Sequence, residues 1–126
     1  MKFPENMAYE VIILPPAKRN LERYIRYTAV TLHNREAAVS IRDDALLTKE
    51  KLSKIADILP LCTDPTLAEL GYRKIPFQKH EFFMIYRIDG KTVIVESMYH
   101  QLQDYESAFI ESIESSGYQD QKENEK

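Results

Sequence analysis

The side chain best suited to proton transfer is His100, at the end of a strand-like segment that begins at Thr92. An imidazole titrates near neutral pH without special perturbation, so it can act as an acid or a base. Two cations, Lys79 and Arg87, share a sheet face with His100 if this segment pairs with the one before it. Basic side chains beside a titrating group suit the binding of a polyanion, and this face is the candidate site.

The pairing is predicted from Asp89 and Gly90, a turn sequence between strand-like residues 81–88 and 92–100. With Asp89 and Gly90 as the turn, Ile88 pairs with Lys91 and alternate residues share a face. One face is mostly apolar and is the expected core: Ile88, Tyr86, Met84 and Phe82 opposite Lys91, Val93, Val95 and Ser97. The other face pairs Arg87 with Thr92, Ile85 with Ile94, Phe83 with Glu96, and Lys79 with His100.

This second face mixes apolar and cationic groups, which favours a groove for a nucleic-acid strand or a partner peptide. The alternative is an ordinary half-solvated sheet face covered by the C-terminal helix. Periodicity does not decide between these two interpretations.

The remaining pattern predicts an α+β fold with a mostly antiparallel sheet. A strand over 8–14 stops at two prolines, and apolar residues at helical spacing follow from Ala17 to about His33. Asn34 is expected to cap a second helix that ends at Pro60. Residues 61–70 are expected to be a loop, 72–77 a strand at an edge because of Pro76, and 102–113 a helix.

The length of 126 residues and the 44% hydrophobic content predict one domain, over 8–116. We expect residues 1–7 to be a flexible leader and 117–126 a disordered acidic tail. The lone cysteine, Cys62, cannot form an internal disulfide. No apolar run approaches the roughly 20 residues of a membrane span, and no signal peptide is evident, so we expect a cytoplasmic protein.

The net charge of −3 is unevenly distributed. Residues 1–100 hold 15 Lys and Arg against 13 Asp and Glu, a net charge of +2, whereas residues 101–126 hold 2 against 7, a net charge of −5. The body of the protein is therefore mildly basic and compatible with a polyanionic substrate.

Several segments, taken in order, resemble the RelE/ParE toxin family of bacterial type II toxin–antitoxin modules. They are residues 9–12 leading into 15–21, then 71–75, then 82–89, and finally Met98, Tyr99 and His100 ahead of Asp104 and Tyr105. The resemblance covers roughly residues 8–106. It implies a single RelE/ParE-like domain of strand, helix, helix and three strands with a C-terminal helix.

The resemblance also implies a toxin held inactive by a cognate antitoxin protein. RelE-like toxins cut mRNA on the ribosome, whereas ParE-like toxins poison DNA gyrase and are not enzymes. Fold alone does not choose between these activities. The first interpretation is a ribosome-dependent mRNA endonuclease, and the alternative is a gyrase inhibitor without enzymatic activity.

The resemblance assigns catalytic roles to His100 and Lys74. Aligned on Tyr86, Lys74 falls on a basic position of the RelE-type site, where such residues orient the phosphate and stabilise its charge. Tyr99 and His100 resemble the Tyr-His pair of YoeB-like relatives, in which the histidine is an acid or a base. Other basic positions are replaced here, by Pro76, Phe83 and Gln101.

Four further residues are candidates for RNA binding: Arg73, Lys79, Arg87 and Tyr105. Arg73 neighbours Lys74 in a strand, so the two point to opposite faces. The cationic face of the first helix, with Lys18, Arg19, Arg23 and Arg26, is a candidate surface for the antitoxin. With no Cys/His cluster and three glycines in all, the sequence predicts neither a metal nor a nucleotide cofactor.

Overall fold

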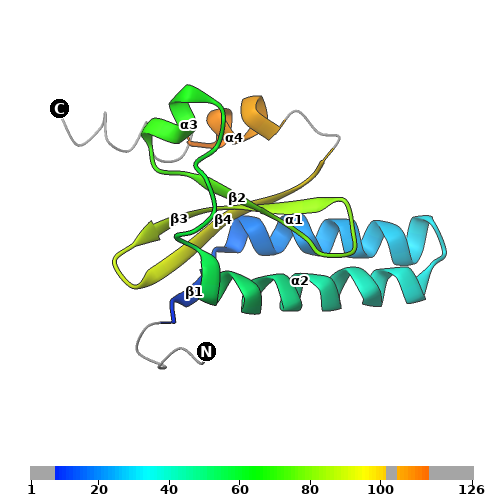
Figure 1. The fold of residues 1–126 in the computed structure, drawn as a ribbon. Helices are drawn as coiled ribbons and strands as arrows, with labels where there is room; N and C mark the ends of the chain where they lie inside the picture. Colours follow the sequence, from blue (N-terminus) through cyan, green and yellow to red (C-terminus); the bar gives the residue numbers. More distant parts are fainter. Residues whose placement is uncertain (1–7, 102–104, 114–126) are drawn as a thin grey trace.

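The computed structural model describes residues 8–101 and 105–113, with backbone alone for 105–107. The predicted leader over 1–7 and the acidic tail over 117–126 lie outside the described residues. Within them the elements form three layers, with two long helices on one face of a sheet and two short helices on the other (Figure 1).

The sheet has the strand order β1 (Glu10–Ile13), β4 (Thr92–His100), β3 (Phe82–Asp89) and β2 (Arg73–Pro76). β1 runs parallel to β4, and the other two pairs are antiparallel. The predicted, mostly antiparallel sheet is thus confirmed. β2 lies at an edge, where the missing N–H of Pro76 costs no ladder bond.

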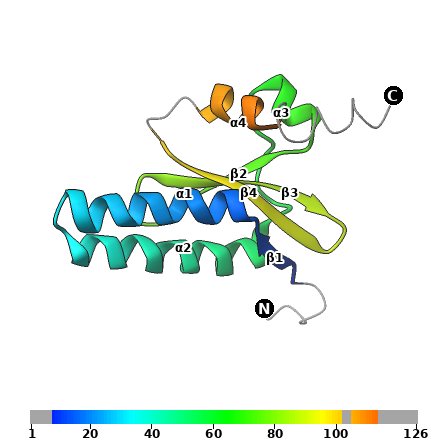
Figure 2. The same cartoon turned by 180° about the vertical axis from the view of Figure 1, so that it is seen from behind.

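One face of the sheet is covered by α1 (Pro15–Arg26), the π-helical turn η2 (Tyr27–Thr31) and α2 (Arg35–Ile55). As predicted, Asn34 caps α2, and its side chain accepts a hydrogen bond of 3.0 Å from the Ala37 N–H. Figure 2 shows α1 and α2 side by side, with the tip of this αα-hairpin extending beyond the sheet.

The opposite face carries α3 (Pro65–Glu69) and α4 (Tyr105–Ile113). The expectation of a loop over 61–70 is wrong in part, because Asp64 begins a short helix there. Its side chain accepts a hydrogen bond of 3.0 Å from the Leu67 N–H, and Pro65 occupies the first turn. Five residues are too few to produce a helical period in the sequence.

Each face of the sheet has its own hydrophobic core. The larger core joins α1 and α2 to the face with Phe82, Met84 and Tyr86, as predicted. The second core contains Phe83 and Ile85. Its other buried members come from α3, α4 and the neighbouring strands and loops: Cys62, Leu67, Tyr72, Tyr99 and Phe109.

The predicted register of the β3–β4 hairpin is wrong in two ways. Asp89 pairs with Thr92, so the turn is Gly90–Lys91, with Gly90 at φ 62°. This is the arrangement of a type II′ turn, which needs a positive φ at its first central residue. In addition, Tyr86 pairs with Val95 but Ile85 pairs with Ser97, so Glu96 is an extra residue in a β-bulge.

The buried Asp44 of α2 ties the helix layer to the loop between β2 and β3. Its carboxylate accepts backbone N–H bonds from Gln78, Lys79 and His80 at 2.8 to 3.0 Å. The His80 Nδ1 also lies 2.8 Å from Oδ2 of Asp44. These four contacts satisfy a carboxylate whose side chain is fully buried, and they fix the start of β3 over α2.

Burial alone would raise the pKa of Asp44. The hydrogen bonds from the His80 side chain and from the three backbone N–H groups outweigh it, so the pKa of Asp44 lies below its usual value. The ionised carboxylate therefore stabilises the fold. That contribution is complete above the unfolded-state pKa of about 4 and is lost as the pH falls through the lower folded-state value.

We predict that Asp44→Asn lowers the free energy of unfolding by about 3 kcal/mol at pH 7, because an amide turns N–H donors toward the backbone N–H groups. Asp43→Asn, at an exposed neighbour, should stay within about 0.5 kcal/mol of the parent. Urea unfolding at pH 7 and pH 3 checks both. The deficit of Asp44→Asn should shrink at pH 3, and a constant deficit would contradict the assigned role.

Candidate functional site

His100 lines a cavity of about 480 Å³ on the α1 side of the sheet. Its ring meets the Phe82 ring edge-on, with centroids 5.1 Å apart, and the Tyr24 ring lies 4.8 Å from that of Phe82. The remaining walls come from α1, η2 and the residue after it: Arg23, Tyr27, Thr28 and Leu32. The cavity is thus mainly aromatic and apolar, with cationic and hydroxyl groups among its lining residues.

Several polar groups around the cavity have partners within the fold. Burial raises the pKa of the Tyr24 phenol, and a hydrogen bond from the His100 backbone offsets part of that effect. Tyr24 therefore stays neutral at physiological pH. The Thr28 hydroxyl donates to the Tyr24 carbonyl at 2.9 Å, and the His100 Nε2 lies 3.9 Å from Oε2 of Glu81.

The predicted grouping of His100 with Lys79 and Arg87 on one sheet face is wrong. The shifted turn alone would make His100 pair with Glu81, and the extra residue in β4 moves its partner by one further residue, to Phe82 instead of the predicted Lys79. Side chains alternate between faces, so an insertion of one residue moves those beyond it to the opposite side. His100 consequently faces α1, whereas Arg87 lies on the face covered by α3 and α4.

Lys74 also belongs to the face covered by α3 and α4. It pairs with Ile85, and its Nζ lies 4.9 Å from the centroid of the Phe83 ring. Lys74 is an exposed residue at this edge of the sheet. The two residues to which the resemblance assigns catalysis, His100 and Lys74, are therefore not brought together.

The positive charge of Arg87 is satisfied within the fold. Its Nε lies 2.5 Å from Oε2 of Glu96, and the same oxygen accepts a hydrogen bond of 3.0 Å from the Tyr72 hydroxyl. The hydrogen bond to Glu96 raises the pKa of Arg87, and burial with the adjacent Glu96 charge raises the pKa of Tyr72. These contacts compete directly with phosphate binding by Arg87.

The other candidates for RNA binding are dispersed. Arg73 pairs with Tyr86, and its guanidinium donates to the Leu59 carbonyl. Lys79 is exposed in the loop that Asp44 holds. Tyr105 begins α4, but its side chain lies outside the described residues.

The groove predicted on the face that carries Phe83 and Ile85 is also wrong. Phe83 is 2% exposed and Ile85 is fully buried, because α3 and α4 pack over them. The alternative interpretation, a sheet face covered by the C-terminal helix, describes this surface better.

The structure adds an arginine-lined groove that the sequence indicates only in part. It has a volume of about 730 Å³ and is lined by Arg19, Glu22, Arg23, Ile25, Arg26 and Arg42. Arg23 also lines the His100 cavity, so the two hollows adjoin. The arginines of the first helix show in the sequence as a cationic face, but Arg42 joins them only through the packing of α2 against α1.

The described residues contain neither a metal-binding cluster nor a helix suited to a membrane. Residues 8–101 and 105–113 contain no group of three or more His, Cys, Asp or Glu side chains placed to hold a metal ion. Within the same ranges, no helix combines the length and the apolar character that crossing a bilayer requires.

The contacts of Arg87 and Lys79 predict different responses to truncation. Arg87→Ala removes one partner of a half-buried ion pair and should lower the free energy of unfolding by about 1 to 2 kcal/mol. Lys79→Ala removes an exposed side chain and should stay within about 0.5 kcal/mol of the parent. Urea unfolding of both variants is the measurement, and equal losses would contradict the assignment of Arg87 to the fold.

Comparisons with known proteins bear on the fold. No protein-family model and no curated protein matches the chain. A chain of the chromosomal ParDE TA system from P. aeruginosa is similar, with a TM-score of 0.61 and 17% identity over 75% of this chain and 97% of that chain. A chain of the toxin-antitoxin complex RelBE2 from Mycobacterium tuberculosis has a TM-score of 0.47 and 21% identity, covering 74% and 98%. The chain therefore has the fold of that ParDE chain, and the RelE/ParE-like fold expected from the resemblance is confirmed.

Proposed function

We propose that this protein is the toxin of a type II toxin–antitoxin module. The observation that carries the proposal is the fold match, which takes in 75% of this chain and 97% of the chain from the ParDE system. The ordered sequence segments that resemble RelE/ParE toxins support it independently. Fold alone carries no activity, so the mode of action is argued from the side chains.

For the mode of action, we propose that the toxin disables a protein target by binding it, as in the gyrase-poisoning members. Cleavage of RNA needs a proton-transfer group and cations around one phosphate. Here His100 faces α1 while Lys74 lies on the opposite face, and Arg87 is bound to Glu96. This separation disfavours the composite nuclease site that the sequence predicts.

One observation favours the mRNA endonuclease as a second candidate. His100 and Arg23 line the same cavity, which supplies a titrating imidazole and a cation for a phosphate. If this cavity were the active centre, His100 would transfer a proton and Arg23 would stabilise the developing charge. The two modes differ in what His100 must do, so one variant separates them.

The antitoxin is proposed to cover apolar residues on the αα-hairpin. Leu46 and Leu47 of α2 are 60% and 43% exposed, and Val30 near the tip is 64% exposed. Exposed leucines grouped on one helix are typical of a surface that accepts an amphipathic partner segment.

We predict that induction of the protein without its antitoxin arrests growth with DNA breaks and an SOS response, while mRNA stays intact. His100→Ala should fold and remain as toxic as the parent. The measurements are an SOS reporter, plasmid supercoiling and mapping of mRNA ends. Cut mRNA that disappears in His100→Ala, with a loss of about 10²- to 10⁴-fold, would instead establish the endonuclease. If induction of the parent and of His100→Ala both left growth unaffected, the toxin proposal would be refuted.

Co-expression with the product of the adjacent reading frame tests the antitoxin surface. Leu46→Glu places a charge in the proposed apolar interface and should reduce co-purification of the partner by about tenfold or more. Ile58→Glu, at a residue 72% exposed after the end of α2, is the matched control and should co-purify normally. Equal retention of the partner by both variants would place the antitoxin elsewhere.

A further inference from the structure

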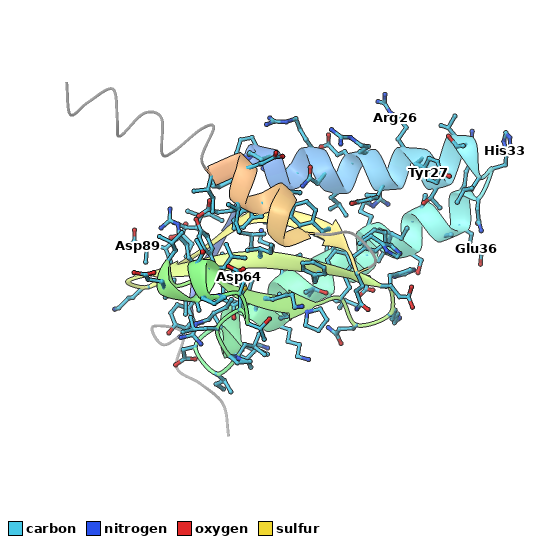
Figure 3. All side chains as sticks on the ribbon, turned by 90° about the horizontal axis from the view of Figure 1, so that it is seen from above. Arg26, Tyr27, His33, Glu36, Asp64 and Asp89 are labelled. Carbon is cyan, nitrogen blue, oxygen red and sulfur yellow. The ribbon has the colours of Figure 1, made fainter. Side chains whose placement is uncertain are left out.

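The arginine-lined groove concentrates positive charge on a protein of net negative charge. Arg19, Arg23 and Arg26 follow one another at four- and three-residue steps on α1, and Arg42 joins them from α2. Glu22 is the one acidic residue in the lining. None of the four arginines forms an ion pair within the described ranges. Figure 3 shows Arg26 pointing outward from α1 and Tyr27 at the same end of the helix.

Helix stability does not account for this arrangement. Arg23 and Arg26 lie in the last turn of α1, where cations interact favourably with the helix dipole. Arg19, the fifth residue of α1, lies outside the last turn and has no such favourable interaction. Like charges at these spacings also repel one another. The groove therefore carries a cost in stability that an anionic ligand would relieve.

The adjoining His100 cavity supplies a different kind of contact. Its volume of about 480 Å³ lies within the range of ligand pockets, and the rings of Tyr24, Phe82 and His100 line it. Tyr27, 53% exposed, adds a fourth ring. The hydroxyl of Thr28 donates to the Tyr24 carbonyl, but its oxygen can still accept a hydrogen bond from the edge of a planar ligand. This lining suits a planar ring that stacks and forms few hydrogen bonds.

We propose that the α1 face binds single-stranded nucleic acid, with a base in the His100 cavity and the neighbouring phosphates on the arginine-lined groove. Each nucleotide supplies both groups that the two hollows select, a planar ring and a negative charge close to it. Arg23, which lines both hollows, lies where ring and phosphate join. An acidic peptide could satisfy the arginines but would need a separate aromatic residue for the cavity.

This binding goes beyond the proposed capture of a protein target and does not depend on it, although it uses the cavity in which the second candidate, the mRNA endonuclease, would act. It is measured on the purified full chain, by fluorescence anisotropy of a labelled ten-nucleotide single-stranded RNA across a series of salt concentrations. We expect affinity to fall steeply with salt, because each phosphate contact contributes about −0.7 to the slope of log K against log salt.

The charge arm of the test uses Arg19→Glu/Arg26→Glu, which should weaken binding by about 50-fold or more and lower the salt slope by about 1.4. The control, Lys51→Glu/Lys91→Glu, makes the same change in net charge at exposed residues outside both hollows. It should weaken binding less than about fivefold, since only the long-range field changes. Equal losses in the two variants, or no binding by the parent at low salt, would overturn the proposal.

The cavity arm uses Tyr27, whose truncation to alanine should weaken binding about tenfold, while Tyr27→Phe retains the ring and should bind like the parent. Duplex RNA of the same length should bind more weakly, because paired bases cannot enter the cavity. Two results would assign the face to an acidic protein partner instead. They are no effect of Tyr27→Ala, and binding of a polyglutamate peptide of equal charge as tight as that of the RNA.

Discussion

The β-bulge at Glu96 decides which side chains of this protein can act together. Without the extra residue, β4 would continue its alternation and place His100 on the face of Arg87. The bulge is held from both sides. The Glu96 carboxylate binds Arg87 and the Tyr72 hydroxyl, and on the other side the Asn20 amide of α1 donates to Ser97 Oγ and the Met98 carbonyl at 3.0 Å each.

Helices cover both faces of the sheet, so the hollows described above lie along the αα-hairpin. α3 and α4 bury the centre of one sheet face, and α1 and α2 bury the other. The two hollows along α1 and α2 are lined by the side chains suited to ligand binding: His100, the arginines and the exposed Tyr27. Asp44 anchors the β2–β3 loop and so fixes where β3 begins over α2.

Local signals predict most of the fold. The Asn34 cap, the edge position of Pro76 and the order of strands and helices follow from short stretches of sequence. The β-bulge cannot be predicted from such short stretches. Asn20 contacts β4 next to the bulge, at residues that are 77 and 78 positions away in the chain. The chemistry of His100 makes it a candidate from sequence alone. Its neighbours are not predictable in this way, because a one-residue change in register moves a side chain to the opposite face of the sheet.

The nuclear Overhauser effects of the His100 ring protons test this placement most directly. Phe82 and Phe83 are adjacent in β3 and point to opposite faces, so each reports one side of the sheet. The described structure predicts effects between His100 and the Phe82 ring, whose centroids are 5.1 Å apart, and none between His100 and Phe83. Effects from His100 to Phe83 or to the Lys79 side chain would show that β4 has no bulge and would contradict the account.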